Sequence, residues 1–389
     1  MVVKVVTTDD GLYGLGCATL TQRPLAVVAA IEEYLRPLLI GRSVDDIEDI
    51  WQAAFLSSYW RSGPVLNNAL SGVDQALWDI KGKRLGVPVY QLFGGKCRRA
   101  ADVYVHANAE TFGELKDQVM DYMTAGYRYV RCQTAIQGYA TYGVANTRAD
   151  VAGGERLAVE QAPWEPRPYC LTVPRMFDYL RSELGEEIEL IHDVHERVPP
   201  ILGIQLAKDL EPYRLFFLED VFAPEDNGYL TMLRAQSSTP IAIGELYVNP
   251  AEYVPLIKDR LIDFIRVHVS DIGGLTPARK LATLSEFFGV RTAWHGPGDV
   301  SPVGHMANLH LDLSSPNFGI QEAYMFNDAC REVFPGCPEI RDGAMWASDE
   351  PGLGIDVDEE AAARFPFPEH PFNGAWPEIR RADGTVVRP

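Results

Sequence analysis

The strongest constraint on the fold is a set of three acidic residues, each of which closes a short apolar run. They are Asp193, Glu219 and Glu245, and each lies 26 residues from the next. That interval holds one strand, one helix and their two connections, the size of a βα unit. The carboxyl ends of parallel strands meet on one face, so we expect the three carboxylates to come together there. Carboxylate oxygens are preferred ligands of hard divalent cations such as Mg²⁺.

The same acids could instead cap the helices that come after them, since acidic side chains are favoured at helix N-termini. A single acid at a strand end would favour that simpler interpretation. Three acids at equal spacing, each behind a strongly apolar run, favour a metal site.

Composition limits the classes of protein that remain. The chain has 389 residues, of which 47% are apolar and 23% charged, as in globular proteins. A formal charge of −19 argues against nucleic acid as a partner, because phosphate binding needs a basic surface. No apolar run is long enough to cross a membrane, and no signal peptide is visible. The six cysteines include no Cys-x-x-Cys pair, which favours reduced thiols in a cytoplasmic protein.

Residues 1–99 are predicted to form an N-terminal α+β domain. Strands are expected at 2–6 and 13–17, joined by a turn at Asp9-Asp10-Gly11. Apolar residues at helical spacing predict helices at 24–39, 44–60 and 67–85. Gly86, with Pro88 beyond it, is a typical stop for the third helix.

From about residue 100 the pattern changes to strands that alternate with helices. The expected strands are 103–108, 128–134, 188–194, 215–221, 241–247, 263–270, 290–295 and 318–323. The expected helices are 111–125, 174–184, 200–209, 228–237, 250–258, 276–288 and 302–312. Eight parallel strands predict an α/β barrel of the TIM type over residues 100–334, with its active site at the strand ends. Residues 335–389 are expected to form a C-terminal segment that packs back over the barrel and over the N-terminal domain, which would cap the barrel.

One insertion interrupts this alternation. Residues 134–173 come after the second barrel strand and are rich in Gly, Ala, Tyr and Pro. Loops of this length inside a compact domain are usually functional. We therefore expect the insertion to contribute to the active site.

Several motifs resemble the enolase superfamily. Ser71-Gly-Val-Asp-Gln-Ala-Leu-Trp-Asp-Ile-Lys81 and Leu92-Phe-Gly-Gly95 resemble its capping-domain signature. Asp193-Val-His195, His295-Gly-Pro-Gly-Asp299 and Gly319-Ile-Gln-Glu322 resemble the mannonate dehydratase family, which includes D-galactonate dehydratase-like and starvation-sensing members. The resemblance covers almost the whole chain. It implies a modified (β/α)7β barrel beneath an α+β capping domain, whose first strand would precede residue 1, and a homo-oligomer of four or eight chains.

The resemblance also implies a reaction, the Mg²⁺-dependent dehydration of a sugar acid to a 2-keto-3-deoxy acid. D-mannonate and D-gluconate are the expected kinds of substrate. The metal ligands would be Asp193, Glu219 and Glu245. A metal-bound carboxylate makes the neighbouring α-proton more acidic, and loss of the 3-hydroxyl then needs a general acid.

By resemblance, the base is a Tyr on the loop after the second barrel strand, beside an Arg on that strand. Tyr142 and Arg131 match these two positions. Taken alone, Tyr142 could be a loop aromatic that packs on the cap, and Tyr129 and Tyr139 are nearby alternatives. Arg131 could equally be a plain ion-pair residue.

The general acid implied by the resemblance is His195. Side chains two apart on a strand share a face, so His195 is expected to point the same way as Asp193. A lone His near a strand end is otherwise more often structural. His192 faces away from Asp193 on the same reasoning, and we interpret it as structural.

The remaining matches are to residues that contact substrate, although a structural role is open for most of them. They are His106, Arg266, His295, Asp299 and Glu322. Thr21 belongs to the same set, but members with sugar-acid activity often carry Asn there. Its single hydroxyl cannot reproduce the two-sided hydrogen bonding of an amide. Pro297 also stands where more active members have a small residue.

These residues support two hypotheses of different class. The first is a Mg²⁺-dependent sugar-acid dehydratase, with slow turnover because of Thr21 and Pro297. The second is a family member that retains the metal site but binds a ligand or partner without appreciable turnover. Racemisation or cycloisomerisation would need a Lys-x-Lys pair on the second strand, where this chain has Arg131-Cys-Gln133.

Overall fold

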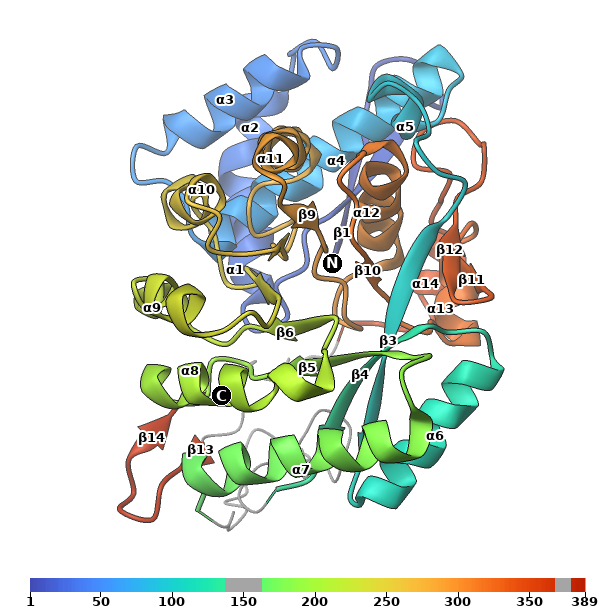
Figure 1. Cartoon of the computed structure of the whole chain (residues 1–389). Coiled ribbons are helices and arrows are strands. Elements are labelled where there is room, and N and C mark those ends of the chain that lie inside the picture. The colour runs from blue at the N-terminus through green and yellow to red at the C-terminus, as the bar shows by residue number, and fades with distance from the viewer. Residues whose placement is uncertain (137–162, 368–378, 389) are drawn as a thin grey trace. The chain divides into compact units, whose positions relative to one another are not determined.

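The computed structural model describes residues 1–136, 163–367 and 379–388 (Figure 1). These residues divide into two compact units, and each is described by itself. The first unit comprises Met1–Asp102, Gly244–Arg260 and Ile265–Phe367. The second comprises Val103–Ile243, Leu261–Phe264 and the described C-terminal residues 379–388. No helix in the described ranges is long and apolar enough to cross a membrane.

The first unit begins with the predicted hairpin. Strands β1 (Val2–Val6) and β2 (Tyr13–Cys17) pair antiparallel. The next helices along the chain are α1 (Pro24–Ala29), the π-helix η1 (Ala30–Leu35), α2 (Arg36–Leu39), α3 (Ile47–Ser57), α4 (Pro64–Leu85) and α5 (Val89–Leu92). The predicted helix at 24–39 is thus divided into α, π and α segments. Gly86 closes α4 at φ +67°, as its predicted role as a stop requires.

Helix α4 lies directly against β2 because two glycines in the strand have no side chains at the contact. A Cβ on Gly14 would lie 2.1 Å from the carbonyl oxygen of Ala76. A Cβ on Gly16 would lie 1.9 Å from the carbonyl oxygen of Gly72. These distances are far below van der Waals contact, so any larger residue would push the helix away from the strand.

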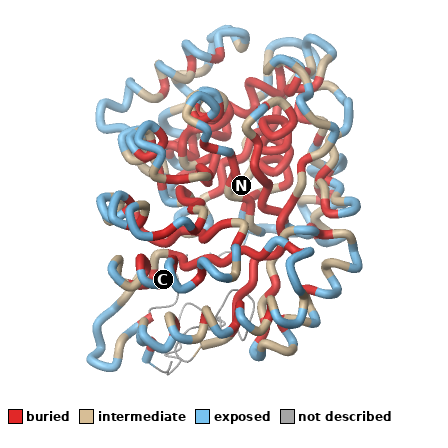
Figure 2. Tube along the Cα trace, in the orientation of Figure 1, coloured by how far each residue is buried: buried red, intermediate tan, exposed pale blue. Residues whose placement is uncertain are grey.

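Two helices of the first unit have long buried stretches (Figure 2): α4 from Asn67 to Ile80, and α12 (Pro302–Ser314) from Pro302 to Leu313. Polar side chains on α4 hold the turn that comes after strand β8 (Phe264–Ile265). Asn67 Nδ2 donates to the carbonyl oxygen of Asp271 at 2.6 Å. Asp74 accepts a hydrogen bond from the backbone N–H of Thr276 at 2.9 Å. The turn after β8 is therefore fixed by the helix that carries the motif Ser71–Lys81.

The rest of the first unit shows the predicted alternation of strands and helices. Its further elements are α10 (Pro250–Lys258), α11 (Leu275–Phe288), β9 (Arg291–Thr292), β10 (Gln321–Glu322), α13 (Asp328–Val333), β11 (Glu339–Arg341), β12 (Ala344–Trp346) and α14 (Glu359–Ala362). Strand β8 is shorter than the predicted range 263–270. The chain turns there, and the N–H of Asp271 donates to the carbonyl oxygen of His268 at 2.9 Å.

The second unit holds the parallel strands that carry two of the predicted acids. In order these are β3 (Ala101–Ala109, whose first two residues belong to the first unit), β4 (Tyr129–Thr134), β5 (Glu189–Asp193), β6 (Phe217–Glu219) and β7 (Ile241–Ile243). Neighbours in this order pair in parallel. Asp193 and Glu219 are the last residues of β5 and β6 and lie opposite each other in register. The predicted position of both acids at strand ends is confirmed.

Helices connect these strands as predicted, except that the second of them begins at Pro166, inside the insertion expected at 134–173. They are α6 (Phe112–Thr124), α7 (Pro166–Leu184), α8 (Pro200–Asp209) and α9 (Tyr229–Gln236), with 3-10 turns η3 (Glu211–Tyr213) and η4 (Pro224–Asp226). Helix α6 lies against both α7 and β4 (Figure 1). Thr111 and Glu114 form a capping box at its start, which satisfies backbone N–H groups of its first turn. A small hairpin of β13 (Ile379–Arg380) and β14 (Val386–Val387) also belongs to this unit.

His310 shows how burial fixes the protonation of a histidine in the first unit. Its Nδ1 accepts a hydrogen bond from the backbone N–H of Tyr90 at 3.1 Å. Its Nε2 lies 3.2 Å from the carbonyl oxygen of Leu353 and so carries the ring proton. Burial lowers the pKa of His310 to about 4, so the ring is neutral in the folded protein at pH 7.

The depressed pKa predicts an acid-dependent loss of stability. An unfolded His has a pKa of about 6.5, so the contribution of His310 is present above that pH and is lost as pH falls through about 4. His310→Gln should lower the free energy of unfolding at pH 7. It should also make the loss of that free energy between pH 6.5 and pH 4 smaller, by up to about 3 kcal/mol. Urea unfolding over a pH series measures this. An unchanged slope would exclude His310 as a source of acid sensitivity.

Candidate active site

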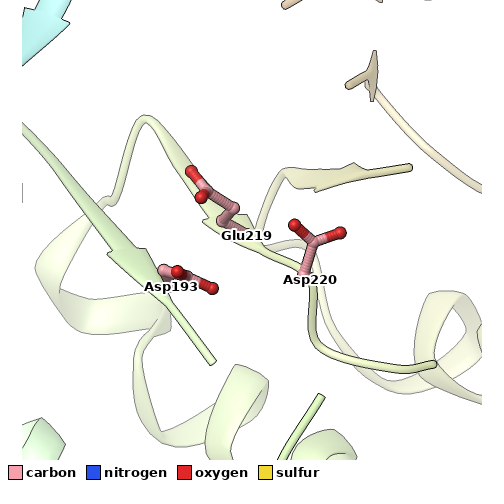
Figure 3. Close-up of side chains that lie close together, drawn as sticks. All are labelled: Asp193, Glu219 and Asp220. Atoms are coloured by element: carbon pink, nitrogen blue, oxygen red, sulfur yellow. The ribbon is translucent and has the colours of Figure 1, made fainter. Parts of the chain in front are cut away.

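Three buried carboxylates come together at the strand ends of the second unit. Ligand atoms of Asp193, Glu219 and Asp220 all lie within 4.8 Å of one another. Figure 3 shows Asp193 at the end of β5, and Glu219 and Asp220 where β6 ends. The parallel register between Asp193 and Glu219 places the two carboxylates side by side. The sequence predicted this pair, but it did not predict Asp220.

One buried cation, Arg131 on β4, bridges the predicted pair. Its Nη1 donates to Asp193 Oδ2 at 3.2 Å and to Glu219 Oε1 at 2.7 Å. The cluster therefore combines three carboxylates with the guanidinium of Arg131, which contacts two of them. Buried charges of like sign are costly to hold together unless cations lie among them. The donor set consists of oxygens alone, and it fits a hard divalent metal ion.

Neighbouring groups orient each of the two carboxylates. The hydroxyl of Tyr104 on β3 donates to Glu219 Oε2 at 3.1 Å. The backbone N–H of His195 donates to Asp193 Oδ1 at 2.7 Å. Both partners belong to the same unit as the acids, so the arrangement is built by the parallel strands and the loop after β5.

Asp220 joins the cluster through an unusual backbone conformation. It comes directly after β6 and has φ +40°, in the left-handed region. In an extended strand, adjacent side chains point to opposite faces, so Asp220 would face away from Glu219. The adjacent acids Glu219 and Asp220 are the one sequence signal that could have indicated that Asp220 joins the cluster. The alternation of side chains along a strand does not predict the left-handed turn at Asp220.

The structure places His195 by a different route from the one predicted. β5 ends at Asp193, and His195 and Glu196 both have left-handed backbone conformations, with φ +51° and +53°. The expectation that His195 shares a strand face with Asp193 was therefore wrong in its reasoning, because the chain leaves the strand first. Two such residues in succession are strained and need support from their surroundings.

The ring of His195 lies beside a second arginine. Arg197 Nη2 is 3.5 Å from His195 Nδ1. A guanidinium can only donate, so Nδ1 must accept and the proton of a neutral ring is on Nε2. An N–H on the outer nitrogen is what a general acid requires.

The rings of two further histidines of this unit, His106 and His192, are held by hydrogen bonds. His106 Nδ1 accepts from Arg131 Nη2 at 3.1 Å, which places its ring proton on Nε2. His192 Nδ1 lies 2.9 Å from the carbonyl oxygen of Cys132, and its Nε2 lies 2.7 Å from the Tyr169 hydroxyl. Burial lowers the pKa of His192 to about 4. Both ring nitrogens of His192 are thus hydrogen-bonded to buried groups, as expected of a structural residue.

The first unit brings together another four of the predicted residues. Arg266 Nη1 donates to Glu245 Oε2 at 2.5 Å, and its Nη2 donates to Glu322 Oε2 at 2.6 Å. His295 Nε2 lies 3.3 Å from Glu245 Oε2. Burial lowers the pKa of His295 to about 3, so this ring is neutral. Glu245 therefore belongs to a network with Arg266 and His295 in this unit.

Thr21 and Asp299 form a second small group in the first unit. Thr21 Oγ1 donates to Asp299 Oδ2 at 3.5 Å, the limit of a hydrogen bond. Desolvation and then the charges of Glu245 and Glu322 raise the pKa of Asp299 to about 6. Asp299 is thus held where negative charge is already dense.

The tyrosine predicted as the base, Tyr142, lies outside the described residues, as does the alternative Tyr139. Tyr129 is described and begins β4, opposite Glu189 at the start of β5. It is therefore at the amino end of the strands, away from the acids at their carboxyl ends. This position argues against Tyr129 as the base.

Comparison with known families defines the class of protein. Residues 1–94 match the family described as mandelate racemase / muconate lactonizing enzyme, N-terminal domain. Residues 173–361 match the family described as enolase C-terminal domain-like. The two matches define the enolase superfamily. The predicted fold class is confirmed at that level, as an α/β chain with an N-terminal capping domain and a C-terminal barrel domain.

Individual relatives narrow the class. D-galactonate dehydratase family member RspA of Pantoea ananatis is 55% identical over 398 residues, which cover 100% of this chain and 95% of the relative. A D-galactonate dehydratase family member of Enterocloster bolteae is 50% identical, with coverage of 100% and 95%. The crystal structure of an enolase from Pantoea ananatis with bound D-gluconate and Mg is 55% identical, with TM-score 0.93 and coverage of 100% and 95%. The chain belongs to the D-galactonate dehydratase family.

The acid cluster predicts how substitutions change metal binding. Asp193→Asn and Glu219→Gln each remove one ligand charge while keeping the side-chain shape, so each should weaken binding of Mg²⁺ more than about 10-fold. Isothermal titration with MgCl₂ measures the affinity. Unchanged affinity in both variants would contradict a metal site at these residues.

Two further variants decide the third ligand. We expect Glu245→Gln to weaken Mg²⁺ binding as much as Glu219→Gln does, because Glu245 closes the third βα unit at the same 26-residue spacing. Asp220→Asn should have the smaller effect. The reverse order of the two effects would assign the third ligand to Asp220.

Proposed function

We propose that this protein is a Mg²⁺-dependent dehydratase that converts a sugar acid of the D-gluconate or D-mannonate type to a 2-keto-3-deoxy acid. One observation carries the proposal. The carboxylates of Asp193 and Glu219 are buried together at strand ends, and Arg131 bridges them. A protein 55% identical to this chain was crystallised with D-gluconate and Mg. The finer assignment to mannonate dehydratases within the superfamily is part of the same proposal.

Asp193, Glu219 and Glu245 would hold the metal ion, in keeping with their spacing in the sequence. When bound, Mg²⁺ supplies a positive charge that makes the proton next to the substrate carboxylate more acidic. Arg131 adds a fixed positive charge beside Asp193 and Glu219. A fixed charge next to two ligands keeps them oriented before substrate arrives.

The chain's own residues would move two protons. Tyr142 would remove the proton from the α-carbon. The electron pair of the broken C–H bond would then form the double bond to the neighbouring carbon. His195 would give its Nε2 proton to the departing 3-hydroxyl, which leaves as water. The resulting enol then becomes the 2-keto-3-deoxy acid.

The remaining predicted residues would bind the substrate chain. They are Thr21, His106, Arg266, His295, Asp299 and Glu322. Arg266, His295 and Glu322 already share one hydrogen-bonded network with Glu245. A cytoplasmic location, a homo-oligomer of four or eight chains and domain limits at residues 99 and 334 remain predictions.

A second candidate function is binding of a sugar acid or partner without appreciable turnover. Its support is the geometry around Thr21. The Thr21 hydroxyl is engaged with Asp299 at 3.5 Å, and it offers one donor where the related Asn offers an amide. Pro297 fixes its own backbone two residues after His295 and has no N–H to donate.

Proton exchange separates the base from the acid. Tyr142→Phe should abolish exchange of the substrate α-proton with deuterated solvent, because the first step loses its base. His195→Asn should abolish dehydration and leave that exchange measurable, because proton abstraction precedes loss of water. Mass spectrometry of recovered D-gluconate reports the exchange, and a colour assay for 2-keto-3-deoxy acid reports the dehydration.

Two results would revise these roles. Full exchange in Tyr142→Phe would exclude the tyrosine as the base. Equal loss of both signals in His195→Asn would mean that the histidine also serves the first step. His310→Gln is the matched control, since it alters a buried histidine of the other unit.

We expect slow dehydration of D-mannonate and D-gluconate by the unmodified chain. A displacement of about 1 Å between substrate and catalytic groups can cost on the order of 10²-fold in rate. The double variant Thr21→Asn with Pro297→Ala should raise the rate by restoring the amide contact and a free backbone N–H. Steady-state assays with both acids measure this. Turnover in the ordinary range of roughly 1–10³ s⁻¹ by the unmodified chain would contradict it.

A further inference from the structure

His268, which no sequence motif singles out, lies in direct contact with His295. It comes after β8 in the first unit and is 4% exposed. The two rings lie with their centroids 5.0 Å apart, and the two Nδ1 atoms are 2.7 Å apart. At that distance a single proton lies between the two nitrogens, so one ring donates and the other accepts.

The far side of His295 decides which ring donates. His295 Nε2 lies 3.3 Å from Glu245 Oε2, and that same oxygen accepts from Arg266 Nη1. An ionised carboxylate can only accept, so His295 Nε2 carries a proton. In the neutral ring Nδ1 then has a lone pair, and the shared proton must come from His268 Nδ1.

The surroundings of His268 agree with this assignment. Its Nε2 is buried and has no hydrogen-bond partner among the described residues, as suits a nitrogen without a proton. The turn that carries the ring is itself held in place. The Asp271 N–H donates to the carbonyl oxygen of His268, and Asn68 Nδ2 donates to Asp271 Oδ1 at 2.5 Å.

We propose that His268 is a positioning residue that keeps His295 in the form with its proton on Nε2. His295 Nε2 then carries an N–H that lies beside Glu245 Oε2, and the same N–H can be shared with a carboxylate or hydroxyl oxygen of a sugar acid. In the other form the same atom would be an acceptor and would repel a carboxylate. The inference rests on the proposed function, and it names the proton state that the substrate site needs.

Three substitutions of His268 separate hydrogen bonding from packing. The amide nitrogen of Asn falls near the Nδ1 position of His, so His268→Asn keeps a donor to His295. The longer His268→Gln places its amide near Nε2 and loses that donor. His268→Phe keeps a ring and has no donor at all. His310→Gln is the matched control, because it changes a buried histidine of the same unit with no described contact to His295.

The first readout is binding of D-gluconate in the presence of MgCl₂, measured by isothermal titration. His268→Phe and His268→Gln should weaken binding by about 10- to 100-fold, the usual effect of removing a group that orients a histidine at a site. His268→Asn and His310→Gln should stay within about 3-fold of the unmodified protein. Equal loss in the Asn and Phe variants would overturn the proposal. Circular dichroism checks that each variant is folded.

The second readout needs neither activity nor a variant of His268. Long-range ¹H–¹⁵N spectra of protein labelled at the histidine ring nitrogens show which nitrogen carries the proton. His295 signals, assigned by their absence in His295→Asn, should show a protonated Nε2 and a bare Nδ1. A proton on Nδ1, in the neutral or the doubly protonated ring, would overturn the inference. If the unmodified chain showed no dehydration, the proposed function would fail, and the spectra would still decide the role of His268.

Discussion

The buried bridge from Arg131 to Asp193 and Glu219 is the interaction on which the candidate site depends. Two carboxylates in one buried place repel each other and are costly to desolvate, so they remain together because a cation lies between them. The parallel register of β4, β5 and β6 brings the three residues together. Arg131 thus compensates part of the negative charge of the pair. A metal ion bound by these acids would compete with the guanidinium for the same oxygens.

Periodic features of the chain could be predicted from its residues, and features that depart from periodicity could not. Equal spacing behind apolar runs placed Asp193 and Glu219 at strand ends, where the structure has them. Asp220 and His195 lie just beyond strands, with positive φ, and no side-chain alternation can predict such residues. His268 was missed for a related reason, because its partner His295 is 27 residues away and the contact arises from the packing of two strand ends.

Identity to relatives settles the family and leaves the substrate open for a physical reason. The fold and the acid cluster at the strand ends depend on packing and charge, which tolerate many substitutions elsewhere. Discrimination between sugar acids depends on single hydrogen bonds, each worth about 1 kcal/mol when made and roughly 1–3 kcal/mol when a buried partner is lost. Thr21 and its contact to Asp299 are of that kind. In general, one residue that contacts substrate can therefore change the preferred acid while the fold stays the same.

The left-handed pair His195-Glu196 sets a limit on how this enzyme class can be made more robust. Glu196 N–H donates to the carbonyl oxygen of Asp220 at 2.7 Å, which ties the loop after β5 to the loop after β6. Glycine at position 196 would relieve the strain of its φ of +53° and would loosen the loop that carries His195. Such a change would favour stability, and under the role proposed for His195 it would cost activity. Under that role, the strained pair His195-Glu196 gives up stability for a fixed position of the His195 ring.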